Sequence, residues 1–243
     1  MLRSALRAAG LEVRRVGAQD WGDPRTYLPF AQTLADAKAA GLSVGDFIDV
    51  QHNQPGATQA VIDRLAGLGV YEGRIDRVCE IGPGSGRYLE KTMAICKPGY
   101  YEIYETEKGW ANWLIAKYGV ILQPTGGTTL AATPSASIDL VQAHKVFVVT
   151  PLLATFSYLL EMARVVRPGG MVVFDVMTEA CIDDATIQRW LAANINWGLY
   201  PGMCSRQVVI DLLTGRGLSL VGTFLEPMRP GSTECMVFKR PAA

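Results

Sequence analysis

The sequence lacks any long hydrophobic run. Its 243 residues contain no stretch of the roughly 18 uninterrupted apolar residues that a membrane-spanning helix needs, and the longest apolar segment, at 146–156, is interrupted by Thr150 and Pro151. The first 17 residues carry arginine at positions 3, 7, 14 and 15 and have no apolar core, so they match neither a secretory signal nor an anchor. We therefore expect a cytoplasmic protein that does not associate with a membrane.

Paired cysteines and an excess of one charge are also missing. The five cysteines are widely separated, with no Cys-x-x-Cys pair, which is typical of isolated thiols rather than of a zinc site or a disulfide framework. The 23 Lys and Arg residues balance 23 Asp and Glu residues, whereas a dedicated nucleic-acid binder needs a large positive excess. A hydrophobic fraction of 49% is ordinary for a globular domain. The composition predicts a globular protein without a nucleic-acid partner.

What the sequence does contain is an alternation of strand-like and helix-like segments. Residues 1–72 are helical with loops, and the helices are expected at 28–41 and 55–70. From residue 73 to 243, short apolar runs alternate with amphipathic segments of about 10–15 residues, which is typical of a parallel α/β sheet. The expected strands span 74–81, 100–105, 120–123, 137–143, 171–177, 218–228 and 233–240, and the expected helices span 85–95, 107–119, 152–166, 185–194 and 205–217.

The connection between the last two strands breaks this alternation. It consists only of Arg229–Ser232, which is too short for a crossover helix and requires antiparallel pairing. We therefore predict a doubly wound α/β fold with a seven-stranded, mostly parallel sheet whose strand 7 is inserted antiparallel. The alternative is that these two strands form an unrelated hairpin subdomain.

A glycine-rich segment links the first strand of the alternation to its first helix. Gly82, Gly84 and Gly86 let the backbone approach a ligand closely, and the amides at the start of the helix point toward that ligand. The spacing is G-x-G-x-G, whereas a dinucleotide site has G-x-G-x-x-G with a pyrophosphate on the helix N-terminus. Glu80 precedes the first glycine by two residues, where a buried carboxylate suits a ligand with an ammonium group and repels a pyrophosphate. The alternative is a tight turn without a ligand.

A second candidate ligand group stands at the end of the second strand. Glu105 lies 19 residues after Gly86, close to the spacing of about 20 residues at which a strand-end carboxylate accepts the hydroxyls of an adenosine ribose. If the register of the strand differs, the ligand group would be the neighbouring Glu102 or Glu107 instead. The alternative to a ligand group is a solvated acid at the strand end. We choose Glu105 because it stands at the very end of the strand.

These motifs occur together in one enzyme family. Over about residues 74–240 the chain resembles a class I S-adenosylmethionine-dependent methyltransferase, on the basis of E-I-G-P-G-S-G at 80–86, Glu105, V-R-P-G-G at 166–170 and the closing antiparallel strand. The resemblance implies that the glycine loop holds the methionine part of the cofactor and that Glu105 holds its ribose. A family motif that contacts adenine lacks its Asp here, so the backbone amide of Gly127 is the expected contact. Gln142 is a further expected cofactor contact.

A narrower resemblance concerns the acceptor. Residues 139–149 resemble a subgroup of bacterial small-molecule and sugar O-methyltransferases, and the whole chain resembles mycobacterial enzymes that methylate mannose hydroxyls in methylmannose polysaccharide synthesis. This implies methyl transfer to a hydroxyl of a sugar or oligosaccharide. Residues 1–72 are then expected to form an N-terminal helical lid and acceptor segment, and residues 73–243 the S-adenosylmethionine-binding methyltransferase domain.

Deprotonation of an alcohol calls for a base with a near-neutral pKa. The histidines of the chain are His52 and His144. His144 directly follows the fourth strand on the ligand side of the sheet, and we predict that it is the general base; a packed or solvated loop histidine is the alternative. Asp20, Glu80 or Asp175 could orient its other nitrogen, and the sequence does not choose among them.

Other residues are candidates for binding the acceptor. His52, in a polar loop, is predicted to hydrogen-bond a sugar, and Trp197 and Tyr200 to stack on one. Lys145 would bind an anionic acceptor unless it is simply solvated. Some sugar O-methyltransferases use Mg²⁺ to polarise a hydroxyl, but the sequence assigns no metal ligand.

The leading hypothesis is thus an S-adenosylmethionine-dependent O-methyltransferase. The competing enzyme is a nicotinamide-dependent oxidoreductase. The early third glycine and the terminal hairpin argue against it. A catalytically inactive cofactor-binding scaffold is the non-enzyme alternative. Because lid segments often pack across a two-fold axis, we expect a homodimer.

Overall fold

The computed structural model describes residues 28–192, 203–228 and 231–242. The predicted acceptor residues Trp197 and Tyr200 lie outside the described residues, as does Asp20. Within the described ranges, no helix is both long enough and apolar enough to cross a membrane.

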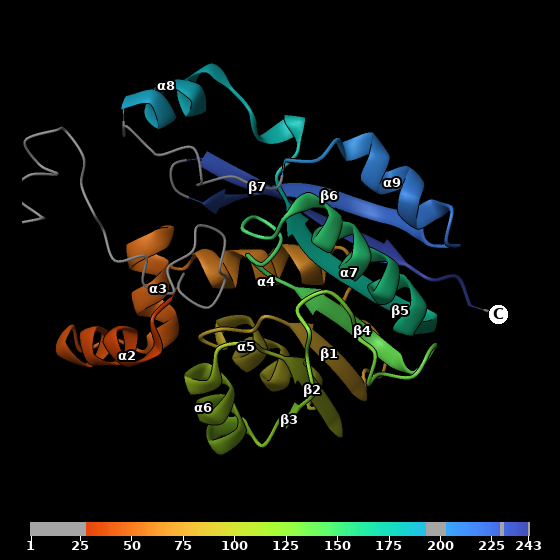
Figure 1. The fold of residues 1–243 in the computed structure, drawn as a ribbon, viewed down its shortest axis with the longest axis horizontal. Helices are drawn as coiled ribbons and strands as arrows, with labels where there is room; N and C mark the ends of the chain where they lie inside the picture. The colour runs from red at the N-terminus through yellow and green to blue at the C-terminus, as the bar shows by residue number, and fades with distance from the viewer. Residues whose placement is uncertain (1–27, 193–202, 229–230, 243) are drawn as a thin grey trace, which may run out of the picture.

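The described residues form a seven-stranded sheet with the order β3-β2-β1-β4-β5-β7-β6 (Figure 1). β7 lies between β5 and β6 and is antiparallel to both, whereas the other neighbouring strands are parallel. This confirms the predicted doubly wound fold and excludes a separate hairpin subdomain. The strands are β1 (Arg77–Ile81), β2 (Tyr100–Tyr104), β3 (Ile121–Leu122), β4 (Ile138–Ala143), β5 (Val166–Val176), β6 (Ser219–Met228) and β7 (Gly231–Lys239).

Helices cover both faces of this sheet (Figure 1). Side chains of α4, α5 and α6 form one buried apolar cluster with the strands, and side chains of α7 and α9 form another on the opposite face. The described helices are α2 (Phe30–Ala39), α3 (Val44–His52), α4 (Ala57–Gly67), α5 (Arg87–Cys96), α6 (Lys108–Tyr118), α7 (Leu152–Val165), α8 (Asp184–Ala192) and α9 (Arg206–Thr214), with a 3-10 turn η2 (Glu179–Cys181).

The central strands are buried on both faces, which explains why they appear in the sequence as continuous apolar runs. In β1, Val78 belongs to the cluster under α4 and α5, and the next residue, Cys79, belongs to the cluster under α7. Leu140 and Val141 of β4 alternate in the same way. Helices therefore bury apolar side chains on each of the two faces of the sheet.

The V-R-P-G-G segment differs from its prediction. We expected a helix through residue 166 and a strand from 171, but α7 ends at Val165 and β5 begins at Val166. Gly170 makes this start possible because a Cβ there would lie 2.8 Å from the backbone oxygen of Asp139. The segment is thus the irregular first part of β5 and not a separate turn.

The N-terminal part of the chain contributes to two regions. Val61, Ile62 and Leu65 of α4 are buried in the cluster on the α5 side of the sheet. α2 and α3 lie beyond the carboxyl ends of the strands (Figure 1). The division of the chain at residue 72 stays a prediction, and a lid built from described residues would consist of α2 and α3.

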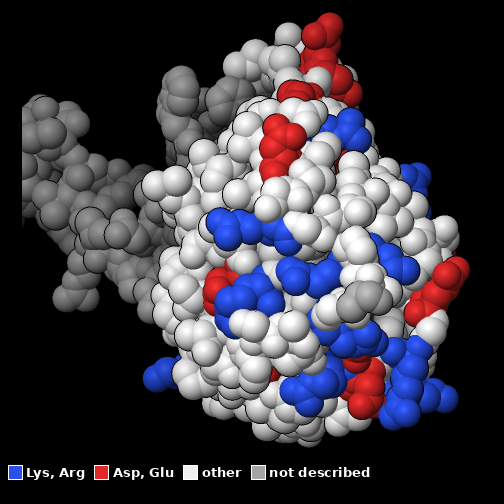
Figure 2. Space-filling model, turned by 90° about the vertical axis from the view of Figure 1, so that its right-hand side faces the viewer, with Lys and Arg blue, Asp and Glu red and all other residues white. Residues whose placement is uncertain are grey.

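Charge is unevenly distributed although the chain has no net charge. Figure 2 shows Lys and Arg gathered on the side of the molecule where α7 ends and β5 begins. At these element ends, Arg167 pairs with Asp139, and Arg164 pairs with Glu161 at 2.7 Å. These two arginines stabilise the ends of elements at the amino ends of the parallel strands, away from the edge where a ligand is expected.

Candidate active site

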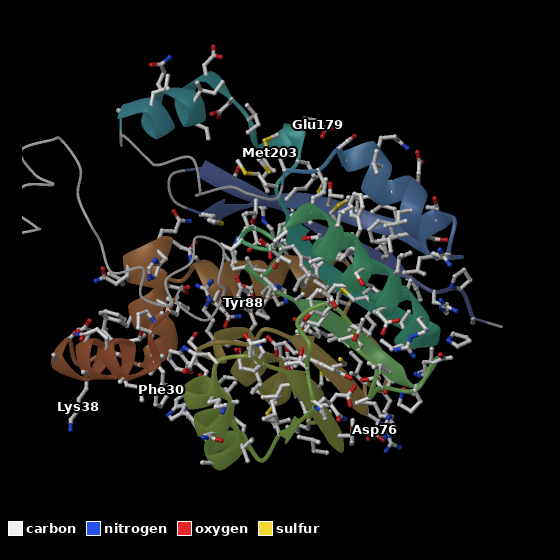
Figure 3. The ribbon with its side chains drawn as sticks, viewed as in Figure 1. Phe30, Lys38, Asp76, Tyr88, Glu179 and Met203 are labelled. Carbon is white, nitrogen blue, oxygen red and sulfur yellow. The ribbon has the colours of Figure 1, made fainter. Side chains whose placement is uncertain are left out.

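A cavity of about 770 Å³ lies at the carboxyl ends of β1, β2 and β4. Its wall consists of the glycine loop after β1, the end of β2, the loops after β3 and β4, and residues of α3. Figure 3 labels one lining residue, Tyr88, near the centre of the molecule. Doubly wound sheets bind their ligands at this edge, and the volume suits a small organic ligand.

The three glycines of the loop all have φ between +50° and +71°, a conformation that favours glycine. At Gly86 a Cβ would lie 2.4 Å from Leu114, so this glycine is needed for packing and does not line the cavity. At Gly84 the nearest atom to a Cβ would be in Leu28, 4.0 Å away, and the residue lines the cavity together with Gly82. The loop therefore presents bare backbone to the cavity.

Glu105 lines the cavity beside this loop. Its carboxylate accepts hydrogen bonds from the backbone N–H groups of Gly84 at 2.9 Å and Glu107 at 2.8 Å. Burial raises its pKa, and these backbone donors oppose that effect. Glu102, the register alternative, is buried elsewhere and accepts from Gln123 at 2.6 Å. Glu107 also lines the cavity but caps α6 by accepting from the N–H of Trp110.

Glu80 and Gln142 are brought together, but neither lines the cavity. Gln142 donates to Glu80 at 3.1 Å, and the Tyr101 hydroxyl donates to the same carboxylate oxygen. Burial raises the pKa of Glu80 to about 7, more than these hydrogen bonds lower it. Both residues thus belong to a buried hydrogen-bond network that includes Thr92 of α5, and their role as direct cofactor contacts stays a prediction.

The predicted adenine contact, Gly127, belongs to the wall of the cavity. Gly127 has φ +84° and nothing within 4 Å of a Cβ position, and it lines the cavity with its neighbour Thr128. Its N–H, the predicted contact group, donates to the Thr125 hydroxyl at 3.1 Å, and its contact with adenine stays a prediction. A planar ligand group has access to bare backbone here.

His144 lines the cavity directly after β4. Its ring stacks on Tyr88, with centroids 4.0 Å apart and an interplanar angle of 13°. It is only 6% exposed, and neither ring nitrogen has a hydrogen-bond partner among the described residues. Burial lowers its pKa to about 3, although Asp175 opposes this shift. The imidazole is therefore neutral near pH 7, but with this pKa it is a weaker base than the near-neutral one that we expected from the sequence.

A buried charged cluster surrounds His144. The Lys145 ammonium contacts Glu226 at 2.9 Å and Asp175 at 3.5 Å, and donates to the Thr233 hydroxyl at 2.6 Å. Burial lowers the pKa of Lys145, but the two carboxylates outweigh this effect and raise it overall. Lys145 is thus neither solvated nor available as a free cation for an anionic acceptor.

The N-terminal segment reaches the cavity through α3. His52 lines the cavity, but it is the last residue of α3 and does not lie in a loop as predicted. Its role as an acceptor contact stays a prediction. Arg87 also lines it and forms a buried ion pair with Asp49 at 2.5 Å. Arg87 was not predicted from the sequence, although its position directly after Gly86 is a usable signal. Glu226 was not predicted either, because it reaches the cluster only through the insertion of β7 beside β5.

No protein-family model matches the chain, and a search of curated proteins gave no match. Several solved structures are similar to it. The cyclase SpnF aligns with a TM-score of 0.63 at 12% identity, over 90% of this chain and 97% of that one. The N-methyltransferase NodS from Bradyrhizobium japonicum WM9, in complex with S-adenosyl-L-homocysteine, aligns with a TM-score of 0.57 at 18% identity, over 81% and 92%.

An O-methyltransferase family protein from Burkholderia thailandensis aligns over 100% of this chain and 83% of that one, with a TM-score of 0.58 at 16% identity. At such identities the likeness shows the fold. The chain has the fold of the class I S-adenosylmethionine-dependent methyltransferases, and its cavity lies at the edge of the sheet where that fold binds ligands.

Proposed function

We propose that the protein is an S-adenosylmethionine-dependent O-methyltransferase that acts on a hydroxyl of a small acceptor, a sugar or an oligosaccharide. The observation that carries the proposal is that a bare glycine loop, a strand-end carboxylate and an unpartnered histidine line one cavity. The methyltransferase fold of its structural neighbours supports the cofactor. The sugar and the likeness to mannoside methyltransferases rest on the sequence alone.

The residues of the cavity fit S-adenosylmethionine. The space beside Gly84 would be filled by any side chain, the Glu105 carboxylate can accept ribose hydroxyls, and Gly127 leaves room for a base. When bound, this cofactor supplies a methyl group already activated by a sulfonium. The protein must then position the acceptor and remove its proton.

His144 is the proposed general base. Its lone pair is available to an acceptor hydroxyl because neither ring nitrogen has a hydrogen-bond partner among the described residues. Burial makes the imidazole a weak base, and the nearby Asp175 opposes this effect. Asp175 and Glu226 lie close enough to stabilise the imidazolium that forms. The cations that line the cavity, Arg87 and Lys145, are each paired with carboxylates, which favours a neutral hydroxyl over an anionic acceptor.

Calorimetric titration tests the cofactor. We expect S-adenosylhomocysteine to bind and NAD to give no heat, because the G-x-G-x-G loop places the third glycine one residue too early for a dinucleotide. Binding of NAD in preference to S-adenosylhomocysteine would indicate the oxidoreductase instead.

A second experiment identifies the acceptor. Mannosides, other sugars and phenols are incubated with the protein and labelled S-adenosylmethionine. Cofactor binding without methyl transfer to any of them would indicate a scaffold.

His144→Gln tests the base. We expect its turnover to fall roughly 100-fold or more, since general base catalysis contributes about 10²–10⁴-fold. Its affinity for S-adenosylhomocysteine should stay within about twofold of wild type because His144 lies on the acceptor side. His52→Gln is the matched control, for which we expect a raised KM rather than a lost kcat. Near-normal turnover of His144→Gln removes it from the mechanism.

A further inference from the structure

Three buried side chains converge behind the cavity from three different strands. His144 follows β4, Asp175 lies in β5 and Glu226 lies in β6. One nitrogen or oxygen of each lies within 4.8 Å of the other two. An imidazole with two carboxylates is a donor set that suits divalent ions such as Mn²⁺, Fe²⁺ or Zn²⁺. The geometry therefore resembles a cation site.

The same three residues carry unsatisfied atoms. Both nitrogens of His144, Oδ2 of Asp175 and Oε1 of Glu226 have no hydrogen-bond partner among the described residues, and all three side chains are at least nine-tenths buried. Buried polar atoms are normally paired, because leaving one unpaired is costly. The two carboxylates among them favour a positively charged occupant beside them.

That occupant is already part of the chain. The Lys145 ammonium lies 2.9 Å from Glu226 and 3.5 Å from Asp175. Its backbone has a φ of +59°, which a lysine rarely adopts, and its N–H donates to Asp175 at 2.5 Å. Asp175 thus holds both the backbone and the side chain of Lys145 in the cluster.

The charge balance explains what the ammonium does. Arg87, the other buried cation nearby, is paired with Asp49, so Lys145 is the cation that contacts Asp175 and Glu226. With Lys145 charged, a divalent ion approaching these carboxylates meets a like charge at close range. Without it, two carboxylates and a neutral imidazole would face one another with no compensating charge.

We propose that the Lys145 ammonium is the resident cation of this site, that it excludes divalent metal ions, and that it thereby leaves the His144 nitrogens free. A neutral residue at position 145 then converts the cluster into a divalent-metal site. The inference concerns metal binding and does not depend on whether the protein transfers methyl groups, so the two proposals can fail separately.

The test is Mn²⁺ binding to the chelator-treated, untagged full chain, measured by calorimetry and by the electron paramagnetic resonance of free Mn²⁺. We expect Lys145→Met to bind one Mn²⁺ on the order of 100-fold more tightly than wild type. Lys145→Met with Asp175→Asn should lose this gain. Lys117→Met, which removes a half-exposed lysine of α6, is the matched control and should behave as wild type.

Two outcomes with folded protein overturn the proposal. One is wild-type protein that binds Mn²⁺ as tightly as Lys145→Met and loses it in Asp175→Asn, which would make a metal the resident cation. The other is a folded Lys145→Met, judged by circular dichroism and cooperative melting, that binds Mn²⁺ no better than wild type. If Lys145→Met and Lys145→Gln both fail to fold, refolding with Mn²⁺ should restore them, and failure to do so also contradicts the proposal.

Discussion

At the scale of single residues, Glu80 shows how a sequence motif can have a structural role. It lies two residues before the glycine loop, but its carboxylate accepts hydrogen bonds from Tyr101 and Gln142, in a buried network that includes Thr92 of α5. Burial raises its pKa from 4.5 to about 7. A carboxyl whose pKa is higher in the folded state destabilises that state as the pH rises. The loss of stability begins near its pKa in the unfolded chain and is complete above its pKa in the folded chain.

The Glu80→Gln substitution should therefore change the pH dependence of stability. Between pH 5 and pH 8 we expect the wild type to lose roughly 2–3 kcal/mol more unfolding free energy than Glu80→Gln, because the variant has no carboxyl to ionise at this site. Urea unfolding across this pH range measures the difference. Glu72→Gln, which changes an exposed carboxyl, serves as the control. Parallel pH profiles for wild type and Glu80→Gln would show that Glu80 does not titrate in this range.

Single residues of the site could be predicted from the sequence where neighbouring elements alone set their positions. Gly82, Gly84, Glu105 and Gly127 line the cavity at positions set by strand ends and turns, which the sequence order reveals. Glu226 was not predictable in this way, since it meets Asp175 and Lys145 only through the β5-β7-β6 order of the sheet. Spacing in the sequence carries no information about which side chains meet across an inserted strand.

At the scale of elements, one buried carboxylate connects three helices. Asp49 of α3 pairs with Arg87 at the start of α5 and accepts hydrogen bonds from the N–H and hydroxyl of Thr58 in α4, each at 2.8 Å. α3 and α5 approach closely here, because a Cβ at Gly45 would lie 3.2 Å from the Arg87 Cβ. This contact holds α3 against the cavity wall.

Asp49→Ala should release α3 and destabilise the chain. It leaves the buried Arg87 without a carboxylate, which typically costs about 3–5 kcal/mol. Chemical denaturation measures this loss, and hydrogen exchange should show faster exchange over residues 44–52 than in the β-strands.

Two variants make this prediction specific. Asp63→Ala, on the exposed side of α4, should change stability by less than about 0.5 kcal/mol. Adding Arg87→Met to Asp49→Ala should recover much of the lost stability, because no unpaired charge then stays buried. If the double variant is as unstable as the sum of the two single ones, the ion pair is not the connection between α3 and α5.

The elements themselves were largely predictable because both faces of the central strands are buried. Strands with two buried faces give continuous apolar runs, as in β1, β4 and the second half of β5. The start of β5 was placed wrongly, since Pro168 and two glycines resemble a turn although the close contact of Gly170 with Asp139 makes them the first part of a strand. Such an approach of two backbones depends on tertiary structure.

At the scale of the whole molecule, the candidate cofactor site joins segments that are distant in the sequence. The cavity wall combines the loops after β1, β3 and β4 with α3 and with Met228 at the end of β6. A ligand that contacts all of them binds the folded chain and not the unfolded one. Binding at this cavity is therefore linked to the stability of the entire fold.

S-adenosylhomocysteine should raise the melting temperature of the chain by a predictable amount. At a ligand concentration about 100-fold above Kd, one site adds roughly 2.7 kcal/mol to the unfolding free energy. For a chain of this size, that corresponds to a shift of about 5–10 °C, measured by calorimetry or fluorescence. In Glu105→Gln the same concentration should give a smaller shift, because an amide cannot accept from two ribose hydroxyls as a carboxylate does. Equal shifts in wild type and Glu105→Gln would place the ribose elsewhere, and an equal shift with NAD would contradict the assigned cofactor.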